Sequence, residues 1–259
     1  MATFAVGDIH GHLPALSEVL DQIRRAARPA DTVVFLGDYI DRGPDSKGCV
    51  DAILKFRHET PAEVVGLLGN HEDWFLRTWR DYARHSWVIG MEAFETVKSY
   101  SPEAVDVLRE AMAQAGAALY LGQCRLPYEV FFDAVPVEHV QFFAGLRLYH
   151  QTVDGLFSHG GVDPRISDVH EQSAEALLWG AGGFPSGYRD ANVVVYGHHD
   201  NATLDSQGWP GPTTIGRTIG IDTISHGVLT AIRLPDQRWF QSSRYETATP
   251  DVQQPVPDL

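Results

Sequence analysis

Cysteine and long apolar segments are both scarce in this chain. Only Cys49 and Cys124 are cysteines among 259 residues, which excludes a disulfide-rich scaffold. Two such thiols are typical of a protein in the reducing cytosol, although one bridge stays open. No segment approaches the roughly 18 apolar residues of a membrane helix, and the N-terminus lacks a basic start followed by an apolar stretch. We therefore expect a cytoplasmic protein without a membrane partner.

Positive charge is also in short supply. Lysine and arginine number 20 against 34 aspartates and glutamates, so the formal net charge is −14. A surface of that sign repels the phosphates of DNA and RNA, so we expect no nucleic-acid partner. Part of the acidic excess is expected to be carboxylates that a bound cation neutralises. Hydrophobic residues make up 44% of the chain, enough for the core of one large domain.

Three apolar segments near the N-terminus each stop at a glycine and are expected to be strands. They are Thr3 to Val6, Thr32 to Leu36 and Val64 to Leu68. The segments between them carry apolar residues at helical spacing. This β-α-β-α-β order predicts an α/β fold whose central strands are buried on both faces.

The later part of the chain changes in character. Residues 74–150 are rich in aromatics and helix formers, and they predict a mainly helical insertion in a single domain of residues 1–246. Strand-like segments return at 156–157 and 192–196, and a hairpin is expected to join 227–234 to 238–241. The tail, 247–259, is polar and proline-rich, so we expect it to be flexible.

Residues of types that commonly bind metal ions or phosphate follow each position where a strand is expected to end. They are Asp8 and His10; Asp38, Asp41 and Arg42; Asn70 and His71; His159; and His198. The carboxyl ends of parallel strands share one edge of a sheet, so these side chains should converge. Helix capping could explain Asp8 or Asn70 alone, but it does not call for histidine. Oxygen and imidazole donors suit manganese, iron or zinc, so the pattern predicts a metal site.

The glycine-bounded blocks GDIHG, GDYIDRG, GNHE, SHGG and YGHH resemble those of the calcineurin-like metallophosphoesterases. They are most similar to the bacterial serine/threonine phosphoprotein phosphatases, and also similar to the symmetrical diadenosine tetraphosphatases. The resemblance runs from Gly7 to about Leu234 and is loose across the insertion. It implies a β-sandwich flanked by helices, which places the α/β prediction in the metallophosphoesterase fold.

The resemblance also implies a role for each residue of the blocks. Two divalent ions are expected, manganese first, with iron, zinc and nickel as alternatives. By resemblance, Asp8 and His10 bind one ion, Asn70, His159 and His198 bind the other, and Asp38 binds both. A water between the ions attacks the phosphate, which Arg42 and Asn70 hold. His71 is the implied general acid, oriented by Asp41.

Two positions depart from the family pattern. Arginines usually stand where this chain has Leu68 and Ala181, so two phosphate contacts are missing from their expected places. Arg165, Arg189 or Arg217 could substitute for them. The glycine-rich loop 180–187 is either a substrate contact or an ordinary surface loop.

Four further residues keep two interpretations. His199 is expected to pack or face solvent rather than the pocket, and His12 either lines the cleft or begins a helix. Asp222 and His226 are expected to support metal ligands from behind, although Asp222 could equally be a turn residue.

The leading functional prediction is a phosphomonoesterase, acting on phosphoserine, phosphothreonine or phosphotyrosine in proteins. The alternative is a hydrolase of small phosphates: nucleotides, sugar phosphates or dinucleoside polyphosphates. Trp74, Trp79 and Trp87 could stack a base, but core packing is favoured. A binding protein built on a decayed phosphatase is disfavoured because the expected site residues are intact.

Overall fold

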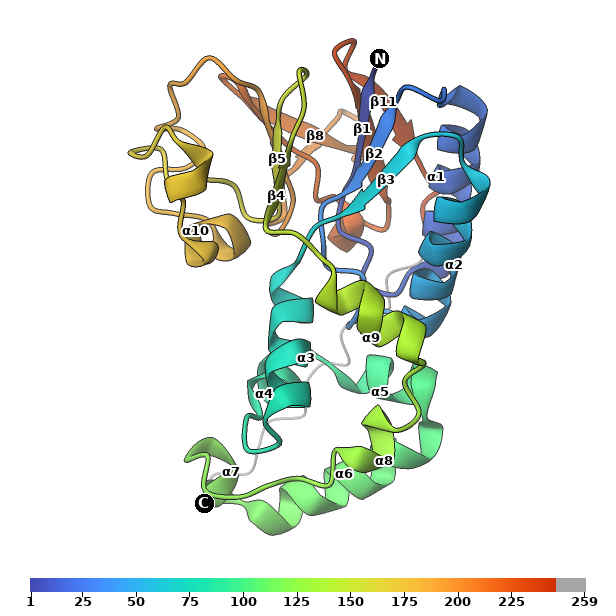
Figure 1. Cartoon of the computed structure of the whole chain (residues 1–259), viewed down its shortest axis with the longest axis vertical. Helices are drawn as coiled ribbons and strands as arrows, with labels where there is room; N and C mark the ends of the chain where they lie inside the picture. The colour runs from blue at the N-terminus through green and yellow to red at the C-terminus, as the bar shows by residue number, and fades with distance from the viewer. Residues whose placement is uncertain (246–259) are drawn as a thin grey trace.

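The computed structural model describes residues 1–245, which form two β-sheets packed face to face with helices around them (Figure 1). The first sheet has the order β11-β10-β1-β2-β3. Its members are β1 (Thr3–Val6), β2 (Thr32–Phe35), β3 (Glu63–Gly66), β10 (Thr230–Leu234) and β11 (Arg238–Gln241). Strands β1, β2 and β3 are parallel; β10 pairs antiparallel with β1, and β11 pairs antiparallel with β10 at the edge of the sheet.

The second sheet has the order β4-β5-β6-β9-β8-β7. Its members are β4 (Tyr149–Gln151), β5 (Leu156–Ser158), β6 (Val194–Tyr196), β7 (Ala202–Leu204), β8 (Pro210–Ile215) and β9 (Thr218–Gly220). Strands β5, β6 and β9 are parallel. Aliphatic side chains from both sheets, such as Val34 and Val195, form the buried layer between them. Five of these six parallel strands, β1, β2, β3, β5 and β6, are followed by the predicted site residues.

Two helices flank the outer face of the first sheet (Figure 1). They are α1 (Leu13–Ala26), which has proline in its first turn, and α2 (Ser46–Glu59), whose N-cap Asp45 accepts a hydrogen bond from the Gly48 N–H. Each buries one stripe of apolar residues against the strands. In the second half of the chain lie α10 (Ala174–Trp179) and short 3₁₀ turns at Val169–Glu171 and Ile224–His226.

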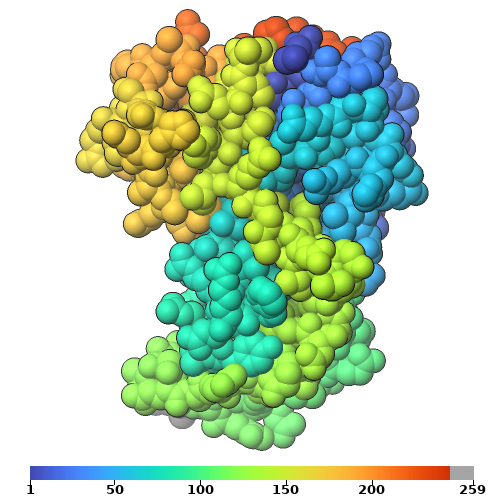
Figure 2. Space-filling view, in the orientation of Figure 1, coloured from blue at the N-terminus to red at the C-terminus, as the bar shows by residue number. Residues whose placement is uncertain are grey.

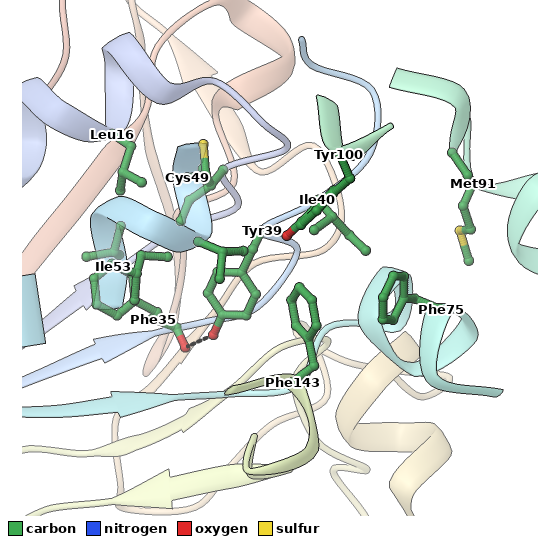
Figure 3. Close-up of a cluster of buried hydrophobic side chains, with 14 of the residues drawn as sticks. Leu16, Phe35, Tyr39, Ile40, Cys49, Ile53, Phe75, Met91, Tyr100 and Phe143 are labelled. Carbon is green, nitrogen blue, oxygen red and sulfur yellow. Dashed lines mark hydrogen bonds between the residues drawn. The ribbon is translucent and has the colours of Figure 1, made fainter. Parts of the chain in front are cut away.

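The insertion forms a helical lobe below the sheets (Figures 1 and 2). Its helices are α3 (Asn70–Arg80), α4 (Ser86–Gly90), α5 (Phe94–Tyr100), α6 (Pro102–Ala115), α7 (Ala117–Tyr120), α8 (Glu129–Phe132) and α9 (Val137–Ala144). Phe75, Trp87 and Phe131 pack ring against ring inside it. This cluster continues into the core beneath α1 and α2 (Figure 3), so the lobe and the first sheet share buried surface.

The predicted β-sandwich flanked by helices is confirmed, and so is the hairpin near the end of the described chain. The third strand differs: it ends at Gly66. The Leu67 N–H still donates to the Phe35 carbonyl of β2, but Leu67 also forms a bridge with Arg147, and the Leu68 N–H donates to the Arg147 carbonyl. Strands β4, β7, β8 and β9 were not expected. The single-domain organisation stays a prediction, and the predicted flexible tail lies outside the described residues.

Two expectations from composition can be compared with residues 1–245. Cys49 and Cys124 are free thiols, so they do not form the disulfide bond that the sequence left open. None of the helices in this range is long and apolar enough to span a bilayer.

Candidate metal centre

Five strand ends bring their polar residues together around Asp38. Its carboxylate oxygens lie 3.5 Å from His10 Nε2, 3.4 Å from His159 Nε2 and 3.9 Å from His71 Nε2. Donor atoms of two groups of residues approach closely enough to hold an ion. The groups are His10, Asp38 and His71, and Asp38, His159 and His198. Asp38 belongs to both, which is the position expected of a residue that binds two ions.

Backbone carbonyls fix the direction of two imidazoles. His10 Nδ1 lies 3.0 Å from the Ile40 carbonyl, and His159 Nδ1 lies 3.0 Å from the Leu36 carbonyl. A carbonyl oxygen only accepts, so both Nδ1 atoms carry hydrogen. Burial lowers the pKa of both rings, which keeps them neutral. Each Nε2 therefore presents a lone pair to the centre, as in many histidines that bind metal.

The arrangement around Asn70 calls for a cation. The side-chain carbonyl of Asn70 lies 2.8 Å from His159 Nε2 and 2.9 Å from His198 Nδ1. Because His159 Nε2 is an acceptor, two lone pairs face each other there. Burial, followed by the neighbouring His159, lowers the pKa of His198 to about 3, so His198 is neutral as well. A divalent ion among these atoms would remove the conflict, and the donor set fits one.

Asp8 supplies a further unsatisfied carboxylate oxygen. One of its oxygens accepts the His198 backbone N–H at 2.9 Å, while the other is buried with no hydrogen-bond partner. Gly197 lets the two segments approach, since any side chain there would collide with this carboxylate. Burial, then Asp222 and Asp38, raise the pKa of Asp8. Crowded buried carboxylates of this kind are stabilised when cations bind.

The pKa of Asp38 is shifted in the opposite direction to that of Asp8. Burial alone would raise its pKa, but His159, His71 and His10 outweigh it and lower the pKa well below the usual range. Asp38 is therefore a carboxylate at neutral pH, ready to bind cations.

Glu72 belongs to the GNHE block, but no role was predicted for it from the sequence. Its buried carboxylate accepts backbone N–H groups of Asp38 at 2.9 Å, Tyr39 at 2.9 Å, Ile40 at 3.3 Å and Gly69 at 3.2 Å. One side chain thus holds the loop that carries Asp38 against the loop that carries Asn70. Burial, followed by Asp38, raises the pKa of Glu72 to about 8.

Glu72→Ala should destabilise the protein by roughly 3 kcal/mol, because it leaves several buried N–H groups without an acceptor. Urea unfolding of the variant and the parent measures this difference. Glu63→Ala, at the exposed start of β3, is the matched control and should shift stability by no more than about 0.5 kcal/mol. Coincident unfolding curves for Glu72→Ala and the parent would show that Glu72 does not anchor the two loops.

Backbone strain is concentrated at the same place. Non-glycine residues with positive φ are His10, Asp38, Asp41, Arg42, Glu92, His198 and Gln237 in the described chain. All except Gln237 belong to the predicted site or contact it. Such angles cost of order 1–3 kcal/mol each, so the surrounding contacts must hold these residues in place.

His71 and Asp41 form a buried pair beside Asp38. His71 Nδ1 lies 2.8 Å from Asp41 Oδ2, so the other ring nitrogen faces the centre. Burial opposes charge on His71, but Asp38 and Asp41 outweigh it and raise its pKa. The geometry allows two roles: His71 could bind an ion with His10, or donate a proton to a leaving oxygen.

Arg42 reaches over the centre. Its Nη1 lies 2.9 Å from His10 Nε2, and its side chain is 46% exposed, so a substrate could contact it. Two of the three proposed substitutes for the missing arginines are engaged elsewhere. Arg165 pairs with Asp163, and Arg189 donates to backbone carbonyls in its own loop. Leu68 is half-buried and packs on the core.

The glycine-rich loop forms one wall of a cavity of about 320 Å³. Trp179, Phe184 and Tyr196 line it together with His199. Trp179 lies edge-on to His198, with ring centroids 5.4 Å apart, so this cavity adjoins the centre. His199 therefore lines a pocket and is exposed, rather than packed in the core.

The other open residues have contacts of their own. His12 stands at the N-cap position of α1 and stacks on Tyr245, with ring centroids 4.1 Å apart, and burial lowers its pKa to about 4. His226 Nε2 lies 2.9 Å from an Asp200 carboxylate oxygen, and the His226 side chain is 30% exposed. Asp222 is buried, and burial, then Asp38, raise its pKa to about 7. One Asp222 carboxylate oxygen has no hydrogen-bond partner, and the charge of Asp222 helps to raise the pKa of Asp8.

Comparison with known proteins agrees with this geometry. The model of the calcineurin-like phosphoesterase family matches residues 1–227. The chain belongs to this family. It is a metallophosphoesterase, and the enzymes of this family depend on two metal ions.

This metallophosphoesterase is similar to several proteins that are named for a phosphatase activity. A symmetrical bis(5'-nucleosyl)-tetraphosphatase from Pectobacterium carotovorum is 27% identical over 96% of this chain and 97% of that protein. Its namesake from Pseudomonas putida is 36% identical, but over only 32% of this chain and 27% of that protein. Among solved structures, a putative diadenosine tetraphosphatase has a TM-score of 0.61 at 19% identity, covering 94% of both chains. A cold-active protein-tyrosine phosphatase from Shewanella has a TM-score of 0.52 at 15% identity, covering 93% of this chain and 80% of its own. These structures share the fold.

Proposed function

We propose that this metallophosphoesterase hydrolyses phosphate monoesters at a pair of divalent ions. The observation that carries the proposal is the convergence of lone pairs at Asn70 and His159 beside Asp38. Asp8 and His10 would hold one ion, Asn70, His159 and His198 the other, and Asp38 both. Bound there, the ions would acidify a water and stabilise the attacking and leaving oxygens. Manganese is the proposed ion, with iron, zinc and nickel as alternatives.

The protein's own residues perform the remaining tasks. Arg42 presents a guanidinium whose geometry matches two phosphate oxygens, and the Asn70 amide would contact a third. His71 would give the proton on Nε2 to the leaving oxygen. Asp41 accepts from Nδ1, which keeps the ring charged and correctly turned. The raised pKa of His71 supports this assignment.

Charge favours a substrate with one phosphate. Arg42 is the guanidinium whose charge acts on Asp8, His10 and Asp222, and the family arginines at Leu68 and Ala181 are absent. One guanidinium and two ions balance a phosphate dianion better than a long polyphosphate. A phosphorylated serine, threonine or tyrosine of a protein is the first candidate. We also propose a cytoplasmic location, which the unpaired thiols support.

A dinucleoside polyphosphate is the second candidate substrate. It is favoured by the Pectobacterium relative, which matches nearly the whole chain and is named for that activity. The cavity beside Trp179 could hold a nucleoside.

A substrate panel separates the candidates. Manganese-loaded protein is assayed with a phosphoserine peptide, p-nitrophenyl phosphate, AMP and diadenosine tetraphosphate, with Asp38→Asn as the inactive control. We expect turnover of monoesters. Turnover of the tetraphosphate alone would replace the first candidate by the second, and no turnover of any ester would overturn the proposed hydrolysis.

A further inference from the structure

The helical insertion reaches the proposed reaction centre at the carboxylate of Asp41. Trp87, in α4, donates its indole N–H to Oδ2 at 2.9 Å, and 3.2 Å separates it from Oδ1. Thr96, in α5, donates its hydroxyl to Oδ1 at 2.6 Å and accepts the Asp41 backbone N–H at 2.7 Å. His71 approaches Oδ2 from α3. Three helices thus place one donor each on this carboxylate.

Core packing explains only part of this arrangement. The Trp87 ring is fully buried, and its centroid lies 5.1 Å from that of Phe75 and 5.4 Å from that of Phe131. A phenylalanine would satisfy those ring contacts. The indole N–H needs a partner when it is buried, and it takes the carboxylate that also holds His71. Thr96 is likewise buried, with its polar atom on Asp41 rather than on its own helix.

The Asp41 carboxylate takes its hydrogen bonds from side chains outside its own loop, although the Asp41 backbone N–H also lies 3.1 Å from the Ser46 hydroxyl. The φ of Asp41 is +71°, a strained angle for a residue with a side chain. A carboxylate joined to a single imidazole could rotate about its Cβ–Cγ bond and swing the ring with it. Donors on both oxygens remove that freedom.

We propose that Trp87 and Thr96 are positioning residues for proton transfer. They fix the Asp41 carboxylate, Asp41 fixes the His71 imidazole, and the imidazole faces the leaving oxygen. The helical insertion is thereby part of the catalytic apparatus and not only a cover for the sandwich. The inference rests on the proposed function, because only a phosphate ester with a poor leaving group needs the proton from His71.

The test compares two esters that differ in their need for that proton. An alkyl phosphate such as glycerol 2-phosphate leaves as a strong base, whereas p-nitrophenolate is stable as the anion. Trp87→Phe keeps the ring and removes the N–H; Thr96→Val keeps the shape and removes the hydroxyl. Each should lower kcat on the alkyl ester about 10-fold or more and lower it much less on the aryl ester. Thr96→Ser, which returns the hydroxyl, should recover most of the alkyl activity.

Two controls separate positioning from general damage. Phe131→Leu disturbs the same aromatic cluster without touching Asp41, so any loss should be equal on both esters. In a His71→Asn background, Trp87→Phe should cause no further loss on the alkyl ester, because the residue it positions is gone. If Trp87→Phe does not fold, the Thr96→Val and Thr96→Ser pair decides alone.

Equal losses on both esters in a folded variant would overturn this inference while leaving hydrolysis intact. A full effect of Trp87→Phe in the absence of His71 would overturn it as well. Wild-type protein that turns over neither ester would overturn the proposed function, and this inference with it.

Discussion

His71→Asn should lower kcat on alkyl phosphates by a factor of about 10² to 10⁴, the usual contribution of a general acid. The loss on p-nitrophenyl phosphate should be far smaller, because that leaving group needs no proton. The expectation comes from the 2.8 Å contact to Asp41, which turns the other ring nitrogen towards the centre. Steady-state kinetics of variant and parent on both esters, with saturating manganese, measure the difference.

Metal titration of the same variant decides between the two roles that the geometry allows. His71 lies with His10 and Asp38 in one candidate group of ligands, yet we assign it to proton transfer. Calorimetry with manganese should therefore find both ions bound by His71→Asn, with affinities close to those of the parent. Loss of one ion, with equal kinetic losses on both esters, would make His71 a ligand instead.

Asp38→Asn should abolish most activity, with kcat/KM falling by roughly 10³-fold or more, since metal stabilisation of the transition state is worth several kcal/mol. The Asp38 carboxylate lies within 4 Å of three imidazoles and belongs to both candidate ligand groups. An amide in its place keeps the shape but removes the negative charge that two cations would share. Calorimetry should show that both binding events weaken.

Asp8→Asn is the matched comparison, because it changes the same chemical group at a position assigned to one ion. It should weaken a single binding event and leave more activity than Asp38→Asn. Thermal melts give a second readout: manganese should raise the Tm of the parent most, of Asp8→Asn less, and of Asp38→Asn least. Normal two-site binding by Asp38→Asn would show that Asp38 does not bridge.

The strands that carry the site were predictable because burial and function coincide in them. β1 and β2 are fully buried, so they appear as largely apolar segments, and an aspartate follows each within three residues. Strands β7 and β8, at one edge of the second sheet, lack this apolar pattern. β7 has two exposed residues out of three, and β8 begins Pro-Gly-Pro, a sequence typical of a turn. Their pairing is fixed by tertiary contacts that no local pattern records.

Site residues could be predicted where they belong to a sequence motif. They could not be predicted where only the three-dimensional fold brings them to the site. Asp8, Asp38 and His159 follow strands within a few residues, so their convergence follows from the α/β order. Glu72 stands inside a recognised block, but its backbone partners lie mostly in another segment. Trp87 meets Asp41 across 46 positions. An aromatic residue in a helical stretch gives no sign that its N–H serves a distant carboxylate.

The strained angles at His10, Asp38, Asp41, Arg42 and His198 set a limit on how this enzyme can be improved. Glycine or asparagine would relieve the backbone strain and gain folding free energy at Arg42 and His198, whose side chains are not fully buried. Selection of a variant library for thermal tolerance alone should therefore enrich the very substitutions that remove ligands and the phosphate contact. A library screened for both traits should instead keep these five residues and gather its stabilising changes in the outer helices and loops.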